Sequence, residues 1–186
     1  MWVHKDNPNP AALYVPKAAK PQKVMVWGCI SYEGRSALHF HDESVNSQVY
    51  QECIEDCLLP SLFEEEWMGL DPDEEYIFRQ DGASCHMSNS TAGYLENALP
   101  KNINFTGRGE WPANSPDLNP IERLWAILQD RVVQRLVYSE EGLIKVVEEE
   151  WWAIPQSTIK ALYDGMDGRV ARCSAVDGGR FALHEK

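Results

Sequence analysis

The apolar and polar positions near the start of the chain alternate as they do in two short β-strands. Residues 23–31 form a compact apolar run, KVMVWGCIS, which is typical of a buried strand. Residues 37–41, ALHFH, alternate two apolar side chains with His39 and His41. A Glu-Gly turn signal at 33–34 lies between the two runs, so the pattern predicts a β-hairpin.

The middle of the chain changes to helical spacing and then alternates helices with strands. Residues 47–59 place apolar side chains three and four positions apart, and Pro60 should end this helix. An acidic loop at 64–75 follows. We further predict a strand at 76–80, a helix at 88–99 with its N-cap at Ser88, Asn89 or Ser90, and a strand at 103–106.

The last third of the chain has the pattern of consecutive helices. Asn119 suits a helix N-cap and Pro120 suits the first helical position, and an amphipathic stripe follows them. Two more helices are predicted near 139–152 and 156–172. A hairpin followed by alternating helices and strands predicts an α/β fold in which a mixed sheet is flanked by helices.

The domain boundaries follow from where these patterns begin and stop. Residues 1–22 are rich in Pro, Asn, Ala and Lys without periodicity, so we expect an extended N-terminal arm. The predicted elements place one domain at 23–172 and a C-terminal tail at 173–186. No apolar run reaches the roughly 18 residues of a membrane span, and no signal-peptide core is present at the start, so no membrane partner is expected.

The charge of the chain is unevenly distributed. The chain holds 17 Lys and Arg against 29 Asp and Glu, a formal net charge of −12, which at first argues against a nucleic-acid partner. Twelve of the acids lie between Ser36 and Phe78, a segment without Lys or Arg, and the remainder is neutral overall. The total therefore does not exclude DNA. Without a basic DNA-binding region, however, these residues alone should bind DNA poorly.

The five cysteines are odd in number and scattered, and they include no C-x-x-C pair. This pattern predicts neither a disulfide framework nor a structural zinc site. Cys53 and Cys57 lie four residues apart on a predicted helix and share a face. We interpret the cysteines as small apolar residues of a reduced, intracellular protein.

Two acids are candidates for chemistry. Asp81 stands where an apolar strand stops and a Gly begins, at the sheet edge where α/β folds concentrate their sites. An Asx turn would explain the same residue. Glu122 falls at the third helical position after Asn119, where a capping-box acid belongs, so local rules alone also explain it. Together, two carboxylates could hold Mg²⁺ ions for phosphodiester chemistry.

Three sequence blocks give these acids a context. They are VMVWGCIS at 24–31, QDGASCH at 80–86 and WPANSPDLNPIERLW at 111–125. In this order they closely resemble the catalytic domain of Tc1/mariner-type transposases, which are DDE superfamily endonucleases. The resemblance runs from about residue 23 to residue 172, and its most specific part is the block at 111–125.

This resemblance implies an RNase H-like fold and a three-carboxylate site that uses Mg²⁺ or Mn²⁺ to cleave DNA and transfer strands. Asp81 and Glu122 match the second and third metal-binding acids of the family. His86 matches a family histidine near the site, although a hydrogen-bonded loop histidine would explain it equally well. We take His86 and Asn119 as accessory candidates. The resemblance also implies transposon-end and target DNA as partners of a full-length parent, allows a homodimer, and implies a nuclear location.

Two departures from the family pattern bear on activity. Forty residues separate Asp81 from Glu122, several more than is usual in the family. The first family acid lies on an opening strand, and neither Asp6 nor Asp42 stands at the matching place, so we expect an N-terminally truncated domain that lacks this acid. Whether the chain is an enzyme as it stands is left open. The alternative is a domesticated or degenerate, non-catalytic remnant, nuclear or cytoplasmic, that serves as a binding or dimerisation module.

Overall fold

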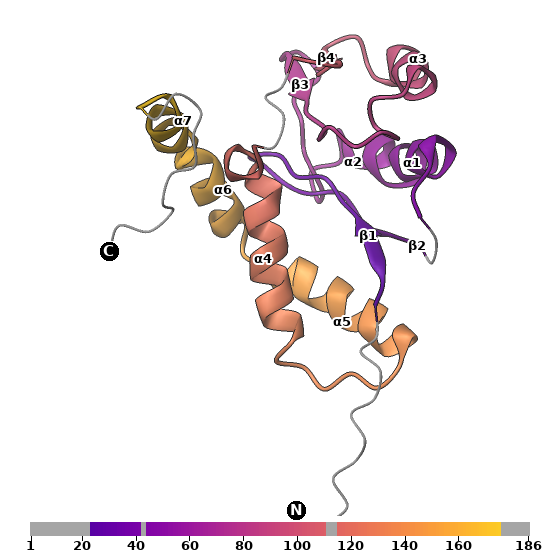
Figure 1. The fold of residues 1–186 in the computed structure, drawn as a ribbon, viewed down its shortest axis with the longest axis vertical. Helices are drawn as coiled ribbons and strands as arrows, with labels where there is room; N and C mark the ends of the chain where they lie inside the picture. Colours follow the sequence, from indigo (N-terminus) through magenta and orange to yellow (C-terminus); the bar gives the residue numbers. More distant parts are fainter. Residues whose placement is uncertain (1–22, 42–43, 111–114, 176–186) are drawn as a thin grey trace, which may run out of the picture.

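The computed structural model describes residues 23–41, 44–110 and 115–175, and its first feature is the predicted hairpin (Figure 1). Strand β1 (Met25–Trp27) pairs antiparallel with β2 (His39–His41), with Val26 opposite Phe40. A bridge between Ile30 and Arg35 continues the pairing toward the turn. The hairpin prediction is therefore confirmed. The proposed arm at 1–22 and most of the proposed tail lie outside the described residues.

The second pair of strands is parallel. Strand β3 (Tyr76–Phe78) pairs with β4 (Ile103–Phe105), and α3 (Asn89–Ala98) lies in the connection between them. The predicted Ser88 is the N-cap of α3, because its hydroxyl accepts from the Thr91 N–H. Parallel and antiparallel pairings are both present, as predicted. The described strands nevertheless form two separate pairs rather than one hydrogen-bonded sheet, and side chains fill the contact between the pairs.

The first predicted helix does not end where expected. Helix α1 (Ser47–Cys53) continues through a π-helical turn (Ile54–Leu58) into α2 (Leu59–Ser61). Pro60 has no N–H to donate within an α-helix, and the wider π turn just before it lets the chain pass this position. The expectation that Pro60 closes the helix is therefore wrong by one residue, and the sequence pattern gave no sign of the π turn.

The C-terminal part is helical, as predicted, with one additional break. A single helix was expected over 156–172, but Gly165 ends one helix and another begins at the next residue. Glycine is a poor helix former and is common at helix ends, which accounts for the break. The elements are a short 3₁₀ turn (Pro116–Leu118), α4 (Pro120–Val132), α5 (Glu140–Ala153), α6 (Gln156–Asp164) and α7 (Met166–Ala175).

The buried apolar side chains form two cores with the hairpin between them (Figure 1). The first core joins α1, the π turn, α3 and β4, and Trp27 packs against it. The second core joins α4, α5 and α6, and Phe40 packs against it. Gly28 permits this close packing, because a Cβ there would lie 2.8 Å from the Leu38 side chain and 3.2 Å from Trp125.

Arg35 ties the hairpin to the helical core. Its side chain is buried and donates hydrogen bonds to the backbone carbonyls of Trp151 and Ile154, the latter at 2.7 Å, and to the Gln156 side chain at 3.2 Å. The Trp151 indole returns a hydrogen bond to the Ser36 carbonyl at 3.0 Å. These bonds satisfy carbonyls at the end of α5 and fix its position on the hairpin.

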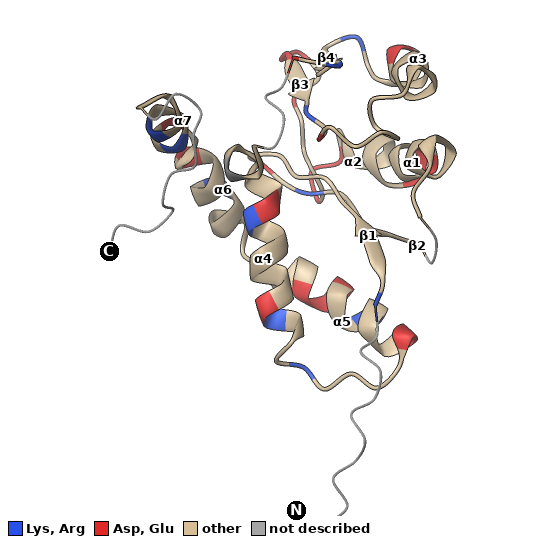
Figure 2. Cartoon of the chain, viewed as in Figure 1, with Lys and Arg blue, Asp and Glu red and all other residues tan. Residues whose placement is uncertain are grey.

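Charge follows the elements in the way the sequence indicated. Figure 2 shows acidic segments on α1, α3 and α5, and basic segments on α7 and at both ends of α4. The described acids between Ser36 and Phe78 lie on α1, the π turn and the loop before β3, which are the segments that build the first core. None of the described helices has the length and apolar character needed to cross a membrane.

Candidate active site

Asp81 lies just beyond the end of β3, at the edge where the sequence placed it. Its Oδ1 accepts a hydrogen bond from the Ala83 N–H at 3.0 Å, which is the predicted Asx turn. The same oxygen accepts from Nδ1 of His86 at 2.5 Å. Because no described hydrogen bond uses the other oxygen, Oδ2, and the side chain is about half exposed at 53%, Asp81 can present this oxygen to a ligand.

The contact with His86 governs the charge state of Asp81. The His86 hydrogen bond is the largest cause that lowers the pKa of Asp81, and the Ala83 N–H adds to it against the opposing effect of burial. A hydrogen bond to the charged form favours that form. Asp81 is therefore held as a carboxylate.

His86 is itself fixed by two residues of the first core. The Tyr50 ring lies against the imidazole, with centroids 3.9 Å apart, and the Tyr50 hydroxyl donates to Gln80 Oε1 at 2.8 Å. Gln80 Nε2 then donates to the His86 carbonyl at 3.3 Å. Sequence reasoning treated Tyr50 only as an apolar helix position. Its polar hydroxyl on a buried face was the one signal that could have indicated this role.

Glu122 lies in the first turn of α4, at the predicted position. Asn119 is the N-cap residue of this helix, but its side chain makes no capping hydrogen bond, so the expected capping box is not formed. Partial burial raises the pKa of Glu122, and the negative charge of Asp81 raises it further. The two candidate acids therefore sense each other electrostatically, although they come from different cores.

The structure brings the predicted residues together to different degrees. Asp81 and His86 are in direct contact, Glu122 lies within electrostatic range of Asp81, and Asn119 stands one turn before Glu122. Among the described residues, these side chains are not a group of three whose ligand atoms all lie within 4.8 Å of one another. Asp6, Asp42 and the segment at 111–114 lie outside the described residues, so no third acid is placed.

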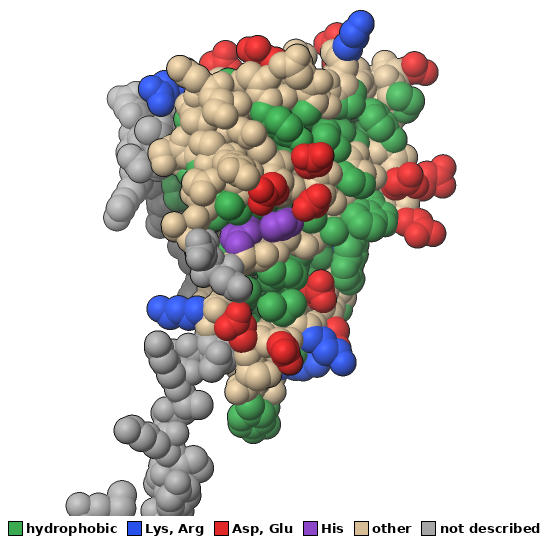
Figure 3. All heavy atoms as spheres, turned by 90° about the vertical axis from the view of Figure 1, so that its right-hand side faces the viewer, with side chains coloured by type: hydrophobic (Ala, Val, Ile, Leu, Met, Phe, Trp, Pro, Cys, Tyr) green, Lys and Arg blue, Asp and Glu red, His purple; other side chains and the backbone are tan. Residues whose placement is uncertain are grey.

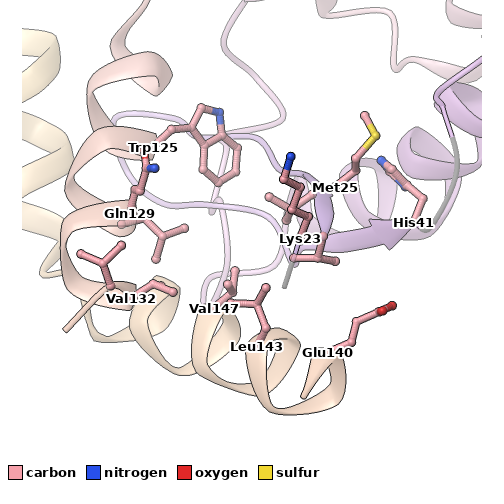
Figure 4. Close-up of a pocket in the computed structure, with 13 residues that line it drawn as sticks. Lys23, Met25, His41, Trp125, Gln129, Val132, Glu140, Leu143 and Val147 are labelled. Carbon is pink, nitrogen blue, oxygen red and sulfur yellow. The ribbon is translucent and has the colours of Figure 1, made fainter. Parts of the chain in front are cut away.

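The candidate acids do not line the mostly apolar cavity beside β1. That pocket has a volume of about 750 Å³ and lies between β1, α4 and α5. Figure 4 shows Lys23, Trp125 and Glu140 around it, among mostly apolar side chains. Asp81 is instead about half exposed just beyond β3, at 53%.

The donor set fits a hard divalent cation. Mg²⁺ and Mn²⁺ prefer carboxylate and water oxygens, and Mg²⁺ is commonly held by only one or two carboxylates. Asp81 offers Oδ2. Burial raises the pKa of Glu122 most, the negative charge of Asp81 raises it further, and a cation bound between the two acids would oppose both effects. Asp81 and Glu122 are the residues that would hold such an ion.

Comparison with known proteins places these observations in a family. The family model described as DDE superfamily endonuclease matches residues 1–144. The Tc3 transposase of Caenorhabditis elegans is 32% identical over 162 residues, covering 83% of this chain and 44% of that protein. The Tcb1 transposase of Caenorhabditis briggsae is 29% identical over 153 residues, covering 82% and 50%. The chain thus spans about half the length of these relatives.

Solved structures agree on the fold. The catalytic domain of the Mos1 mariner transposase matches with a TM-score of 0.74 and 23% identity, covering 88% of this chain and 78% of that one. The same domain with raltegravir and Mg matches with a TM-score of 0.72 and 22% identity, covering 86% and 77%. A Mos1 paired-end complex with the left transposon end matches with a TM-score of 0.72 and 22% identity, covering 98% and 51%.

The fold of these structures confirms the predicted RNase H-like class, even though the described strands of this chain form two separate pairs. The family model covers more than half of the chain, including both candidate acids and the blocks around them. This chain therefore belongs to the DDE superfamily endonucleases, as a Tc1/mariner-type transposase catalytic domain.

Proposed function

We propose that this domain cleaves DNA and transfers its strands in transposition, with Mg²⁺ or Mn²⁺ held by Asp81 and Glu122. The observation that carries the proposal is the family match over residues 1–144, which includes both acids, and their electrostatic coupling agrees with it. Forty residues separate them in the sequence and they lie on elements beside different cores, yet the charge of Asp81 contributes to the raised pKa of Glu122. Local folding rules do not require two carboxylates to approach each other, whereas cation binding does.

Related proteins support the same activity. The curated relatives are named as transposases of transposable elements. Structures of the Mos1 catalytic domain include Mn or Mg, and another Mos1 structure is a paired-end complex with a transposon end. These names favour a divalent metal ion, transposon DNA and a paired-end assembly for this domain. We further propose that the assembly is a homodimer and that it acts in the nucleus, where the DNA substrate is.

The described residues have distinct roles in this proposal. Asp81 Oδ2 and the Glu122 carboxylate would bind the cation and orient it. His86 keeps Asp81 ionised and fixes the carboxylate plane by occupying Oδ1. When bound, two ions of this class activate the attacking oxygen and stabilise the leaving oxygen of a phosphodiester.

The first test measures cation binding directly. The purified chain is titrated with Mn²⁺ and followed by electron paramagnetic resonance, which reports free ion. Asp81→Asn and Glu122→Gln should each weaken Mn²⁺ binding. Glu148→Gln, an exposed acid on α5, is the matched control and should leave it unchanged.

The second test measures cleavage of duplex DNA that carries the element's terminal sequence, with Mg²⁺ or Mn²⁺ present. Asp81→Asn and Glu122→Gln should abolish metal-dependent nicking, while Glu148→Gln should retain it. Full activity in either site variant would overturn the assignment. Absence of nicking by the unmodified chain, despite normal Mn²⁺ binding, would instead support the non-catalytic alternative.

A further inference from the structure

A second group of metal-ligating side chains comes from β2 and α1 and shares no residue with the Asp81 and Glu122 site. One ring nitrogen of His39, one of His41 and the Cys53 sulfur all lie within 4.8 Å of one another. Among the described residues, these three side chains form a group of His, Cys, Asp or Glu ligands close enough to share one metal ion. No short sequence motif such as C-x-x-C indicates this group, because its three residues come from two separate elements.

The strand geometry places the two histidines on one face. His39 and His41 are two residues apart on β2, so both point away from the side on which Phe40 packs into the helical core. Their Nδ1 atoms are 3.0 Å apart. Two nitrogen ligands at about 2.0–2.1 Å on a tetrahedral zinc ion lie roughly 3.3 Å apart, so little movement is needed for both to bind one ion.

Cys53 supplies a sulfur from the last turn of α1. Its side chain is fully buried, with 0% exposure, and burial is the largest cause that raises its pKa to about 12. Without an ion this residue is a neutral thiol. Coordination replaces the thiol proton, which passes to solvent, and leaves a thiolate–metal bond.

The Asp56 carboxylate lies near the second ring nitrogen of His39. Asp56, in the π turn after α1, places its Oδ2 3.6 Å from His39 Nε2, the ring nitrogen that does not face His41. Histidines that bind metal commonly direct their second ring nitrogen at a carboxylate, which fixes the tautomer and the ring orientation. Figure 3 shows histidine side chains lying side by side at the surface, with acidic side chains around them.

We propose that His39, His41 and Cys53 bind one zinc-class metal ion, with Asp56 orienting His39. Two nitrogens and one sulfur suit Zn²⁺ or Co²⁺ and are unsuited to Mg²⁺, which prefers oxygen ligands. Three protein ligands leave a fourth position for water. Such an ion would join the hairpin to α1 and is independent of the proposed cation at Asp81 and Glu122.

Co²⁺ is the probe that separates the two sites, because only a thiolate ligand gives a sulfur-to-cobalt charge-transfer band. The full chain, freed of metal with a chelator, is titrated with Co²⁺ and then with Zn²⁺. We expect a charge-transfer band that saturates at one equivalent of Co²⁺ and is removed by Zn²⁺. Cys53→Ser should eliminate the band, and Cys57→Ser, a buried cysteine one turn away, should retain it.

Two further variants distinguish ligation from structural damage. His41→Ala changes a partly exposed residue and should abolish one-to-one Co²⁺ binding and the rise in Tm on adding Zn²⁺, with the metal-free Tm little changed. Asp56→Asn should weaken Co²⁺ affinity about 10- to 100-fold. Asp81→Asn should leave the band intact.

The proposal is overturned if the folded, unmodified chain shows no charge-transfer band. It is also overturned if the band survives in Cys53→Ser, or if His41→Ala binds Co²⁺ as tightly as the unmodified chain. Loss of DNA nicking in Asp81→Asn with the band retained would support both sites separately. Failure of nicking alone would bear only on the proposed transposase activity.

Discussion

Replacing Arg35 with leucine should undock the helical core from the hairpin. Arg35 is only 6% exposed and donates to two backbone carbonyls at the end of α5 and the connection to α6. A hydrogen bond from a charged donor contributes about 1.5–3 kcal/mol, so these two give about 3–6 kcal/mol. Since leucine retains part of the packing, we expect a loss of about 3–5 kcal/mol, a large share of the total stability of about 5–15 kcal/mol of a typical domain.

The assay is urea unfolding followed by tryptophan fluorescence and circular dichroism, compared at a constant m-value. Arg35→Lys is the first control, because lysine keeps the charge but cannot donate to two carbonyls in the forked geometry of arginine. Its stability should lie between that of the unmodified chain and that of Arg35→Leu. Arg135→Leu is the second control, because Arg135 is exposed and its ion pairs with acids of α5 are screened by solvent, so this change should cost much less stability than Arg35→Leu. A loss below about 1 kcal/mol for Arg35→Leu would refute the reasoning.

Four further substitutions test the packing and charge of the fold. Gly34→Ala should lower the free energy of unfolding by about 3 kcal/mol or more, because its Cβ would lie 1.5 Å from the Trp67 carbonyl oxygen. Gly93→Ala is the matched control: its Cβ would point into open space on α3, so the substitution should raise the free energy of unfolding by about 0.5–1 kcal/mol. Thermal unfolding measures both changes. Leu124→Ala should cost about 2–5 kcal/mol in urea unfolding, because the side chain is fully buried, and a loss below about 1 kcal/mol would contradict the second core. Hydrogen bonds from two arginines lower the pKa of Glu150 in the folded state. Glu150 therefore stabilises the fold at pH values above its pKa in the unfolded chain, and this stabilisation is lost as the pH falls through its lower pKa in the folded chain. Glu150→Gln should therefore flatten the fall in urea midpoint between about pH 6 and about pH 3, and an unchanged profile would exclude this contribution.

The elements that local patterns determine were predictable. The hairpin followed from apolar alternation on both sides of a turn, and the start of α4 followed from Asn119 and Pro120. The π turn before Pro60 and the helix break at Gly165 were missed, because hydrophobic periodicity does not distinguish a continuous helix from one that is widened or interrupted by a single residue.

The candidate site was predictable only through the family resemblance. An Asx turn explains Asp81 locally, and the first helical turn explains Glu122 locally, so neither position alone indicates that the two acids meet. The group of His39, His41 and Cys53 shows the same limit. The alternation of the histidines and the helical position of the cysteine can be read from local pattern, but only tertiary packing brings the three side chains together.

The division of the fold into two cores has a thermodynamic consequence for the proposed activity. Asp81 is held by His86, which packs on Tyr50 of the first core, and Glu122 lies on a helix of the second core. A sub-global opening that releases α4, α5 and α6 would remove one acid while leaving the other in its native turn. By linkage, an ion that joins both acids stabilises the docked state. Amide hydrogen exchange in α4 should therefore slow when Mn²⁺ is added, while exchange in α3 stays the same.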